Sequence, residues 1–275
     1  MRLLGLGSNW SVAGRVVLVT GASSGIGAGV VRDLVGRGGT VVAVARRAEL
    51  LEDLVTSTRG GPGRVEAHAC DLTRADDVDR LVTNVRDSVG RVDVLVNNAG
   101  RSIRRSIAVS HDRAHDFERT MAINYLGAVR LTLGLVPTML AQGEGHVVNV
   151  VTAGVQLRSP LFSAYIASKS ALDAFGRIMA REMRDQGVTV TNVRLPLVRT
   201  DMIAPTDEFA TAPALSVDQA AERVRRAIEC RPIAVNELHA TAFELLSVLA
   251  PGLADRMSHW ASRGLTESRA AMRRG

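Results

Sequence analysis

Short apolar runs rich in β-branched residues alternate along the chain with longer segments whose apolar positions recur every three or four residues. The short runs are bounded by Gly, Asp, Asn or Pro and predict β-strands. They are Val16–Thr20, Thr40–Ala45, Arg64–Ala69, Val92–Val96, His146–Val151 and Val188–Arg194. The longer segments predict helices at Gly25–Arg37, Ala75–Val89, Phe117–Ala141 and Ala164–Gln186.

This alternation predicts an α/β fold of the doubly wound Rossmann type, with one parallel sheet of about seven strands and helices on both faces. At 275 residues, the chain suits a single domain over 1–275. The stretch 200–216 mixes Met, Ile, Phe and Pro with few helix signals, so we expect a substrate lid there. We expect the Arg-rich tail after residue 263 to be loosely held.

Composition places the chain among ordinary enzymes. It is 46% hydrophobic and 23% charged, and only 3% aromatic, so the core must be aliphatic. The two cysteines, Cys70 and Cys230, have neither disulfide-framework nor zinc-ligand spacing, and the first ten residues do not make a signal peptide. We therefore expect a cytoplasmic protein.

The net charge of +6 suits an anionic ligand, but the arginines are scattered without an aromatic stacking surface, which argues against nucleic acid. The apolar stretch Phe243–Ala254 is interrupted by Glu244 and Pro251 and is shorter than the roughly 20 residues of a membrane span. We expect no transmembrane segment, while peripheral contact with a membrane stays open.

A metal site is not expected. His111 and His115 are four residues apart, each followed by an aspartate, but no further ligand cluster accompanies them. A solvated helix start explains them better.

A glycine-rich turn, Thr20–Gly27, follows the first predicted strand and leads into a helix. Glycines permit a tight turn and close approach of the backbone to a pyrophosphate, and a helix N-terminus favours negative charge. A plain strand-to-helix turn is the alternative. The candidate dinucleotide contacts here are Gly21, Ser23, Ser24, Gly25, Ile26 and Gly27.

The second strand ends at Ala45 and is followed by Arg46, where an NAD site usually carries an acid that binds the ribose hydroxyls. An arginine there would neutralise the 2′-phosphate of NADP instead. We therefore expect NADP(H) in preference to NAD(H); the alternative is a surface arginine in an Arg-rich chain. Asp71 could bind the adenine amino group or cap the next helix.

Tyr165 and Lys169 are four residues apart in a predicted helix, so both side chains emerge on one face. An ammonium beside a phenol favours the phenolate, which would make Tyr165 a workable acid and base. A solvated helix pair is the usual explanation of such spacing. However, Lys169 is the only lysine among 34 Lys and Arg residues, which indicates that this position needs an ammonium.

Together these motifs resemble those of the short-chain dehydrogenase/reductase family, over about residues 16–202. The resemblance rests on the glycine turn, on Asn97-Asn98-Ala99-Gly100, on Asn124, and on Tyr165 with Lys169. It implies an enzyme in which Asn124 distorts its helix and holds a water that links Lys169 to solvent; a helix-surface amide is the alternative. It also implies cofactor contacts at Leu72, Asn98, Ala99, Gly100, Tyr165, Lys169, Val198 and Thr200.

The chain departs from the family pattern at two places. Thr152 stands where the family has its catalytic serine; it keeps the hydroxyl, but its methyl group restricts the rotamer and narrows the pocket. The second departure is Leu195-Pro196-Leu197 after the sixth strand, where the family commonly has Pro-Gly. We expect a retained but more selective site.

Three stretches are similar to bacterial reductases of fatty aldehydes and fatty acyl groups: residues 97–107, 115–121 and 195–206. A lipophilic substrate is therefore expected. Arg101, Arg104 and Arg105 could bind an anionic carrier phosphate or carboxylate, or could be solvated surface.

Several alternatives stay open. They are a steroid or other cyclic alcohol dehydrogenase, a ketoacyl reductase, and a nucleotide-sensing protein that kept the fold but lost turnover. The helices predicted at 117–141 and 164–186 should have leftover apolar faces, so a homodimer or homotetramer is expected, with packing inside the domain as the alternative.

Overall fold

The computed structural model describes residues 10–203, 209 and 211–263. Within this part of the chain, seven parallel strands form one sheet in the order β3-β2-β1-β4-β5-β6-β7. The doubly wound Rossmann prediction is confirmed. The strands are β1 Val16–Thr20, β2 Thr40–Ala45, β3 Arg64–Ala69, β4 Val94–Asn97, β5 Gly145–Thr152, β6 Val188–Leu195 and the two-residue β7 Ala234–Val235.

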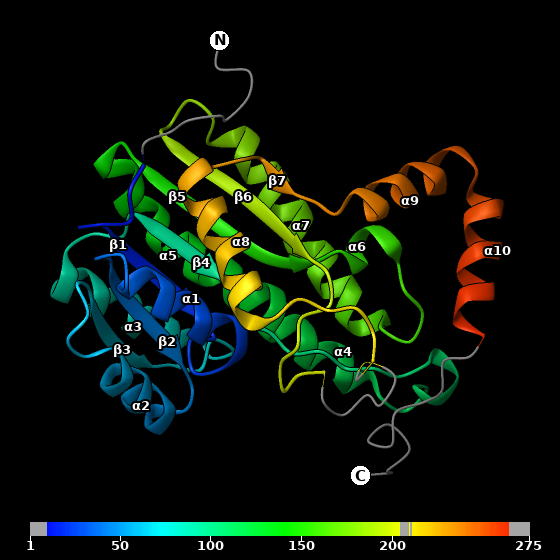
Figure 1. Cartoon of the computed structure of the whole chain (residues 1–275), viewed down its shortest axis with the longest axis horizontal. Coiled ribbons are helices and arrows are strands. Elements are labelled where there is room, and N and C mark those ends of the chain that lie inside the picture. The colour runs from blue at the N-terminus through cyan, green and yellow to red at the C-terminus, as the bar shows by residue number, and fades with distance from the viewer. Residues whose placement is uncertain (1–9, 204–208, 210, 264–275) are drawn as a thin grey trace.

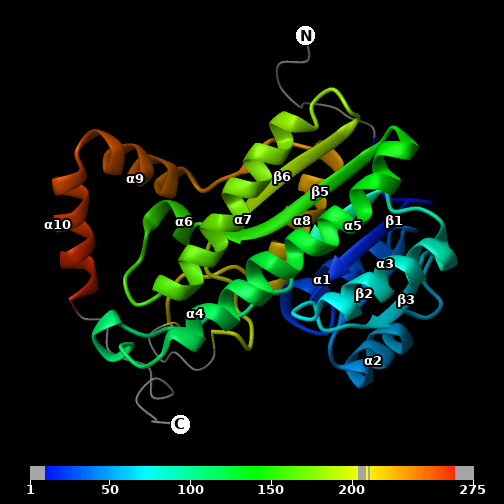
Figure 2. The same ribbon diagram turned by 180° about the vertical axis from the view of Figure 1, so that it is seen from behind.

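Helices cover both faces of the sheet, as the opposite views in Figures 1 and 2 show. One face carries α1 Gly25–Val35, α2 Ala48–Thr58 and α8 Val217–Cys230. The other carries α3 Ala75–Val89, α5 Gly127–Gln142 and α7 Ser163–Glu182. Shorter or peripheral elements are α4 Ala114–Met121, α6 Gly154–Leu157, α9 Leu238–Leu249 and α10 Pro251–Ser262.

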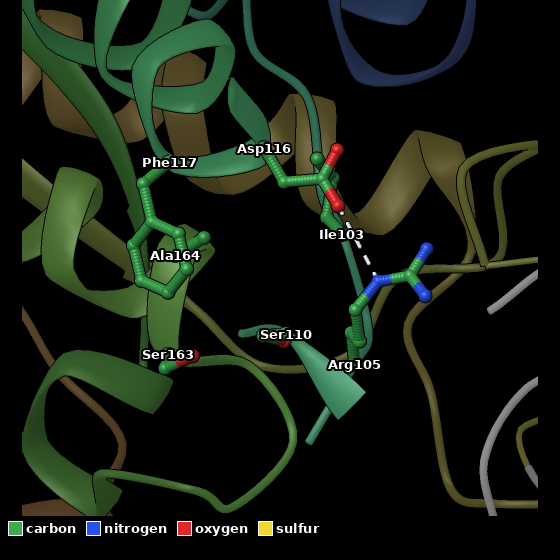
Figure 3. Close-up of a pocket in the computed structure, with 7 residues that line it drawn as sticks. All are labelled: Ile103, Arg105, Ser110, Asp116, Phe117, Ser163 and Ala164. Carbon is green, nitrogen blue, oxygen red and sulfur yellow. Dashed lines mark ion pairs between the residues drawn. The ribbon is translucent and has the colours of Figure 1, made fainter. Parts of the chain in front are cut away.

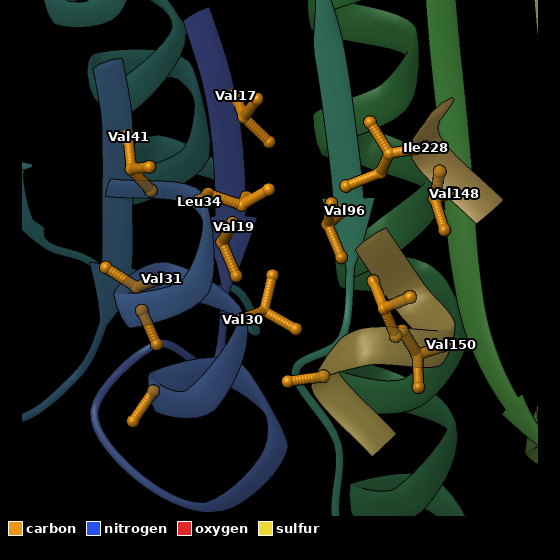
Figure 4. Packing of buried hydrophobic residues seen from close by; sticks show 14 of the residues in the cluster. Val17, Val19, Val30, Val31, Leu34, Val41, Val96, Val148, Val150 and Ile228 are labelled. Carbon is orange, nitrogen blue, oxygen red and sulfur yellow. The ribbon is translucent and has the colours of Figure 1, made fainter. Parts of the chain in front are cut away.

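The strands are buried on both faces because successive side chains point to opposite sides. In β1, Val17 and Val19 pack with α1 and α8, whereas Val16 and Leu18 pack with α3 and α5. Figure 4 shows the first of these two clusters, in which Leu34 lies against the strands. The aliphatic core that the composition predicted therefore fills two layers around one sheet.

The fourth strand begins later than its apolar pattern predicted. Val92 is buried, but the residues that pair as β4 start at Val94. The preceding Asp93 instead binds the start of β1. The Asp93 carboxylate accepts a hydrogen bond from Val16 N at 2.8 Å, and Asp93 N donates to Val16 O at 2.9 Å.

The helix predicted at 117–141 is one continuous rod over 114–142 that changes its winding midway. Between α4 and α5 lies a π-helical turn, η2 Ala122–Leu126, which contains Asn124. A π-turn inserts an extra residue and commonly marks a functional position. The helix distortion that the family resemblance implied at Asn124 is present.

By length and composition alone, the rod Ala114–Gln142 could cross a membrane. It is also a core helix of the fold, since Leu131, Leu135 and Met139 pack into the buried cluster on the α3 side of the sheet. Core helices of this kind meet the same criterion, so the segment is weak evidence for a span.

The segment after β6 pairs with the residues just before α8. Arg199 N donates to Leu215 O, and Leu215 N donates to Leu197 O, both at 2.9 Å. Ser216 then begins α8 with a capping box completed by Gln219. Residues 204–208 and 210 of the expected lid, and the tail after 263, lie outside the described residues.

Candidate active site

The glycine turn between β1 and α1 is shaped so that only glycine fits. Gly21 and Gly25 have φ angles of +66° and +52°, which side-chain-bearing residues rarely adopt. A Cβ on Gly27 would lie 2.2 Å from Gly21 O. Ser24 precedes α1 and makes no side-chain capping bond, so the first-turn N–H groups are not taken up by its hydroxyl. These features fit a cradle for a pyrophosphate.

The remaining residues predicted in the turn line the same feature. Ser23 and Ile26 are half-buried, Ser24 is exposed, and Ile26 packs against the core cluster on the α1 side. Because β1 and β4 are neighbours at the point where the strand order reverses, this turn lies at the usual ligand crevice of such sheets.

The loop after β4 closes the other side of that crevice. Asn98 Nδ2 donates to Thr20 O at 2.9 Å, and the N–H groups of Asn98 and Ala99 both donate to Thr20 Oγ1 at 3.0 Å. These bonds tie the end of β4 to the end of β1. Asn98 and Ala99 therefore lie beside the glycine turn, as their predicted role requires.

Gly100 packs against two of the predicted catalytic side chains. A Cβ at this position would lie 3.1 Å from Asn124 Oδ1 and 3.3 Å from Lys169 Nζ. Asn124 is fully buried: its Oδ1 accepts from Arg101 N at 2.7 Å, and its Nδ2 donates to Arg101 O and Ser168 Oγ, both at 2.9 Å. The helix-surface alternative for Asn124 is wrong.

The same bonds give the Asn124 side chain a structural role. Its amide group holds the loop after Gly100 against α7 rather than pointing to solvent. The water that the resemblance implied beside Lys169 stays a prediction.

Tyr165 and Lys169 lie one turn apart on α7, near the end of β5. Lys169 is 4% exposed and its Nζ donates to Val150 O at 2.8 Å. Tyr165 is hydrogen-bonded to the Thr152 hydroxyl, and Thr152 Oγ1 also accepts from Gly154 N at 3.1 Å. The solvated-pair alternative is wrong, and the structure brings Tyr165, Lys169 and Thr152 together.

Burial sets the charge state of this pair. It raises the pKa of Tyr165 to about 12, while the hydrogen bond with Thr152 acts in the opposite direction. Burial also lowers the pKa of Lys169 to about 8. The shift at Tyr165 is opposite to the one expected from the nearby ammonium, because removing the phenolate from water costs more than its neighbours return. The polypeptide thus holds Tyr165 as a phenol that can donate a proton.

The predicted adenosine side lies beyond β2 and β3. Arg46 is exposed at the end of β2. Burial alone would raise the pKa of Asp71, but the hydrogen bonds from Thr73 and the charges of Arg46 and Arg74 together outweigh it and lower that pKa. Arg46 and Asp71 are therefore near enough to interact.

Asp71 does not cap the following helix. Its carboxylate accepts from Thr73 N at 3.0 Å and Thr73 Oγ1 at 2.7 Å, and Arg74, the residue before α3, makes no side-chain capping bond. The helix-capping alternative for Asp71 is wrong, because its carboxylate binds Thr73 in the turn before the helix. Next to it, Leu72 is buried, and its carbonyl oxygen would be 2.7 Å from a Cβ on Gly127.

Val198 and Thr200 approach the site from the segment after β6. Val198 is buried and pairs with Leu215 in an isolated bridge. Thr200 Oγ1 donates to Val198 O at 3.4 Å, and Thr200 Cγ2 lies 3.2 Å from where a Cβ on Gly25 would stand. Thr200 therefore lies against the glycine turn, and Val198 O accepts its hydroxyl hydrogen bond.

Two features of the site were missed by the sequence analysis. The first is a buried amide ladder beneath it, in which Asn97 Nδ2 donates to Asn149 Oδ1, and Asn149 Nδ2 donates to Asn192 Oδ1, both at 3.0 Å. The three residues are register partners on β4, β5 and β6. Asparagines inside apolar strands were the available signal.

The second is a stack of aromatic rings beside Tyr165. Phe162 meets the Tyr165 ring edge-on at 6.4 Å between centroids, and it stacks on Phe209 at 6.1 Å. The Arg104 guanidinium carbon lies 5.9 Å from the centre of the Phe209 ring. From the expected lid, Phe209 thus reaches the Phe162 ring that contacts Tyr165.

A shallow pocket lies beside the start of α7. Figure 3 shows Phe117 and Ala164 on one side and the ion pair between Arg105 and Asp116 on the other. That pair measures 3.3 Å from Arg105 Nε to Asp116 Oδ2. Arg104 is 7% exposed, so the solvated-surface alternative is wrong for Arg104 and Arg105, whereas Arg101 is exposed.

Comparison with known proteins agrees with this arrangement. Residues 15–210 match the family model for short chain dehydrogenases. The chain is 45% identical over 222 residues to a fatty acyl-CoA reductase of Acinetobacter baylyi, covering 81% of this chain and 75% of that one. It is 45% identical over 241 residues to a fatty acyl-CoA reductase of Mycobacterium tuberculosis, covering 87% and 82%.

A solved structure of a metagenomic short-chain oxidoreductase in complex with NADP superposes with a TM-score of 0.71. It is 29% identical, and the match covers 83% of this chain and 97% of that one. The family match spans the glycine turn, the loop after β4, and α7 with its Tyr165 and Lys169. The chain therefore belongs to the short-chain dehydrogenase/reductase family of oxidoreductases.

Proposed function

We propose that this enzyme uses NADPH to reduce the carbonyl group of a long-chain fatty acyl substrate, either an aldehyde or an acyl thioester. The observation that carries the proposal is the half-buried Tyr165 phenol, bonded to Thr152 and one helical turn from the buried Lys169, close to the glycine turn. The names of the two fatty acyl-CoA reductases to which the chain is similar support the substrate class.

NADPH, when bound, supplies the hydride that is added to the carbonyl carbon. Thr152 and Tyr165 would both donate hydrogen bonds to the substrate oxygen, which orients it and stabilises its developing negative charge. Tyr165 then transfers its proton to that oxygen, which gives an alcohol from an aldehyde and a hemithioacetal from an acyl thioester. The C–S bond of the hemithioacetal then breaks, which releases the carrier thiol and leaves the aldehyde. A pKa of about 12 keeps Tyr165 protonated before this step, which suits the reducing direction.

Lys169 restores the proton and holds the cofactor ribose in this scheme. With a pKa lowered to about 8 by burial, it is still largely an ammonium at neutral pH, yet it can release a proton. Asn124 holds the loop after Gly100 in place around it.

NADP(H) is the proposed cofactor in preference to NAD(H). Arg46 follows β2 at the position where an acidic residue would bind the ribose of NAD, and its exposed guanidinium is available to a 2′-phosphate. The similarity to a relative that was solved with NADP supports the choice.

The carrier part of an acyl thioester is proposed to contact Arg101. Arg105 is paired with Asp116 and Arg104 lies over Phe209, whereas the Arg101 side chain is exposed and its backbone is fixed by Asn124. Arg101→Ala should raise KM for an acyl-CoA several-fold and leave KM for the free aldehyde unchanged. If the KM for the acyl-CoA is the same in Arg101→Ala as in the wild type, Arg101 does not contact the carrier.

A substrate panel tests the proposed function. NADPH and NADH oxidation is measured with aldehydes and acyl-CoA thioesters of two to sixteen carbons, a β-ketoacyl thioester and a cyclic ketone. We expect kcat/KM to rise with chain length and NADPH to be preferred. A preference for the cyclic ketone indicates a steroid or cyclic alcohol dehydrogenase, and one for the β-ketoacyl thioester indicates a ketoacyl reductase.

The enzyme is further proposed to form a homodimer, or a homotetramer built from it, through α5, η2 and α7. Leu126, Leu133 and Leu140 are seven residues apart and are 42%, 59% and 38% exposed, and Ile178 on α7 is 53% exposed. These side chains form the apolar faces that the sequence predicted. Leu133→Glu should lower the molar mass measured by light scattering, and an unchanged mass would exclude this interface.

A further inference from the structure

The last two described helices form an apolar arm that projects from the sheet. We define the C-terminal arm as α9 and α10, which Figures 1 and 2 show standing away from the strands. Of the 15 large apolar side chains that are exposed among the described residues, seven belong to this arm. They are Leu238, Leu245, Val248, Leu249, Leu253, Met257 and Trp260.

Exposed apolar side chains recur at helical intervals on both helices. Leu238, Leu245 and Leu249 recur at helical intervals of seven and four along α9, while Leu253 and Trp260 are seven apart along α10. Such faces normally pack against a core. Here Leu238 is 86% exposed and Leu249 is 82% exposed, so the face lacks cover within the described chain.

Trp260 points to an interfacial environment. It is one of two tryptophans and is 75% exposed, whereas the guanidinium groups of Arg15 and Arg231 both lie against the Trp10 ring. Tryptophan is enriched where an apolar phase meets water, since its ring is apolar and its indole N–H is polar.

An excess of arginines follows the arm along the sequence, whereas the arm itself carries Arg256 against Glu244 and Asp255. From position 251 to 275, the sequence has five arginines against Asp255 and Glu267, a formal net charge of +3. Arg256 and Arg263 lie on or directly after α10 and are exposed. Apolar helices flanked by arginines bind surfaces that combine hydrocarbon with negative charge.

We propose that the C-terminal arm docks the enzyme on anionic lipid membrane surfaces. A second copy of the chain as the occupant is an outcome that the test below distinguishes. One acyl chain is too thin to cover two helices. The biological purpose of this membrane docking rests on the proposed function, since long acyl substrates reside in membranes.

The arm is attached close to the catalytic site. Gln156 on α6 is 1% exposed, and its Nε2 donates to Glu244 Oε2 at 2.7 Å and to Thr241 Oγ1 at 3.3 Å on α9. Gln156 is four residues after Thr152, the proposed substrate-binding hydroxyl. Docking through the arm would therefore hold the substrate site near the lipid surface.

Vesicle binding tests the proposal with the full chain. Co-sedimentation is measured with equimolar phosphatidylglycerol and phosphatidylcholine vesicles, and with phosphatidylcholine alone. The wild type should bind the anionic vesicles more tightly, and added salt should weaken that binding. Leu249→Glu and Trp260→Glu should each reduce the partition coefficient about tenfold or more, because a charge replaces an inserted apolar group.

Ile233→Glu is the matched control, since Ile233 is 64% exposed outside the arm and receives the same charge. It should change vesicle binding less than twofold. All three variants should reduce a short, water-soluble aldehyde as the wild type does, which checks folding. If no aldehyde is reduced but arm-dependent vesicle binding persists, the proposed function fails and the docking proposal stands.

Two results would overturn the docking proposal. One is an absence of binding to anionic vesicles, or binding that Leu249→Glu and Trp260→Glu leave intact. The other is a lower molar mass in those variants with unchanged vesicle binding, which would assign the arm to a second copy of the chain.

Discussion

Gly27→Ala tests whether the glycine turn is a dinucleotide cradle. The added Cβ would lie 2.2 Å from Gly21 O and 2.7 Å from Asn98 Nδ2, whereas ordinary contacts begin near 3.4 Å. The nearest neighbour is backbone, so no rotamer change relieves the clash, and α1 or the turn must move by about 1 Å. Overpacking of this kind costs about 1–3 kcal/mol.

If the strain falls on the turn that holds the pyrophosphate, the Kd for NADPH should rise about tenfold to a hundredfold. Binding is measured by NADPH fluorescence, after circular dichroism has shown that the variant is folded. Gly252→Ala is the control, because a Cβ there meets nothing within 4 Å. A Gly27→Ala protein that binds NADPH as tightly as Gly252→Ala does would refute the cradle.

Three further predictions concern the catalytic and specificity residues. Thr152→Ala should lower kcat about 100-fold, while Thr152→Ser stays within a few-fold of wild type; unchanged turnover in both would exclude the assigned role. Because the pKa of Lys169 is lowered from 10.5 to about 8, the unfolded chain binds more protons between these pH values, so the free energy of unfolding should rise with pH across that window. Urea denaturation at pH 7.5 and 10 should show that rise in wild type and a smaller one in Lys169→Met, and equal rises would contradict it. Arg46→Glu should raise KM for NADPH at least tenfold and leave KM for NADH less affected, and a parallel loss of both would remove Arg46 from cofactor selection.

Local patterns in the sequence were sufficient for most of the fold. β1, β2, β3 and α3 have the predicted bounds, because their apolar periodicity and their flanking glycines are visible in a short window. The parallel, doubly wound sheet followed from the alternation of strand and helix. The start of β4 was missed because Asp93 binds Val16, 77 residues earlier in the chain, and a window on one strand cannot contain that contact.

The candidate site likewise has residues that local spacing predicted and features that depend on tertiary structure. Motif residues such as Gly27, Tyr165 and Lys169 were found from spacing, and the fold brings them to one edge of the sheet. The amide ladder through Asn149 was missed because it depends on the register of three strands. The pKa shift of Tyr165 was predicted in the wrong direction, since burial depends on tertiary packing that spacing does not reveal.

The central claim is that Tyr165 supplies the proton that completes carbonyl reduction. The most direct test is single-turnover oxidation of NADPH by a long-chain aldehyde in wild type and Tyr165→Phe, with the Kd for NADPH measured on both proteins. The account predicts that Tyr165→Phe lowers the rate at least about 100-fold while NADPH affinity stays within about twofold, because only the hydroxyl is removed. A Tyr165→Phe enzyme that reduces the aldehyde at the wild-type rate would contradict it.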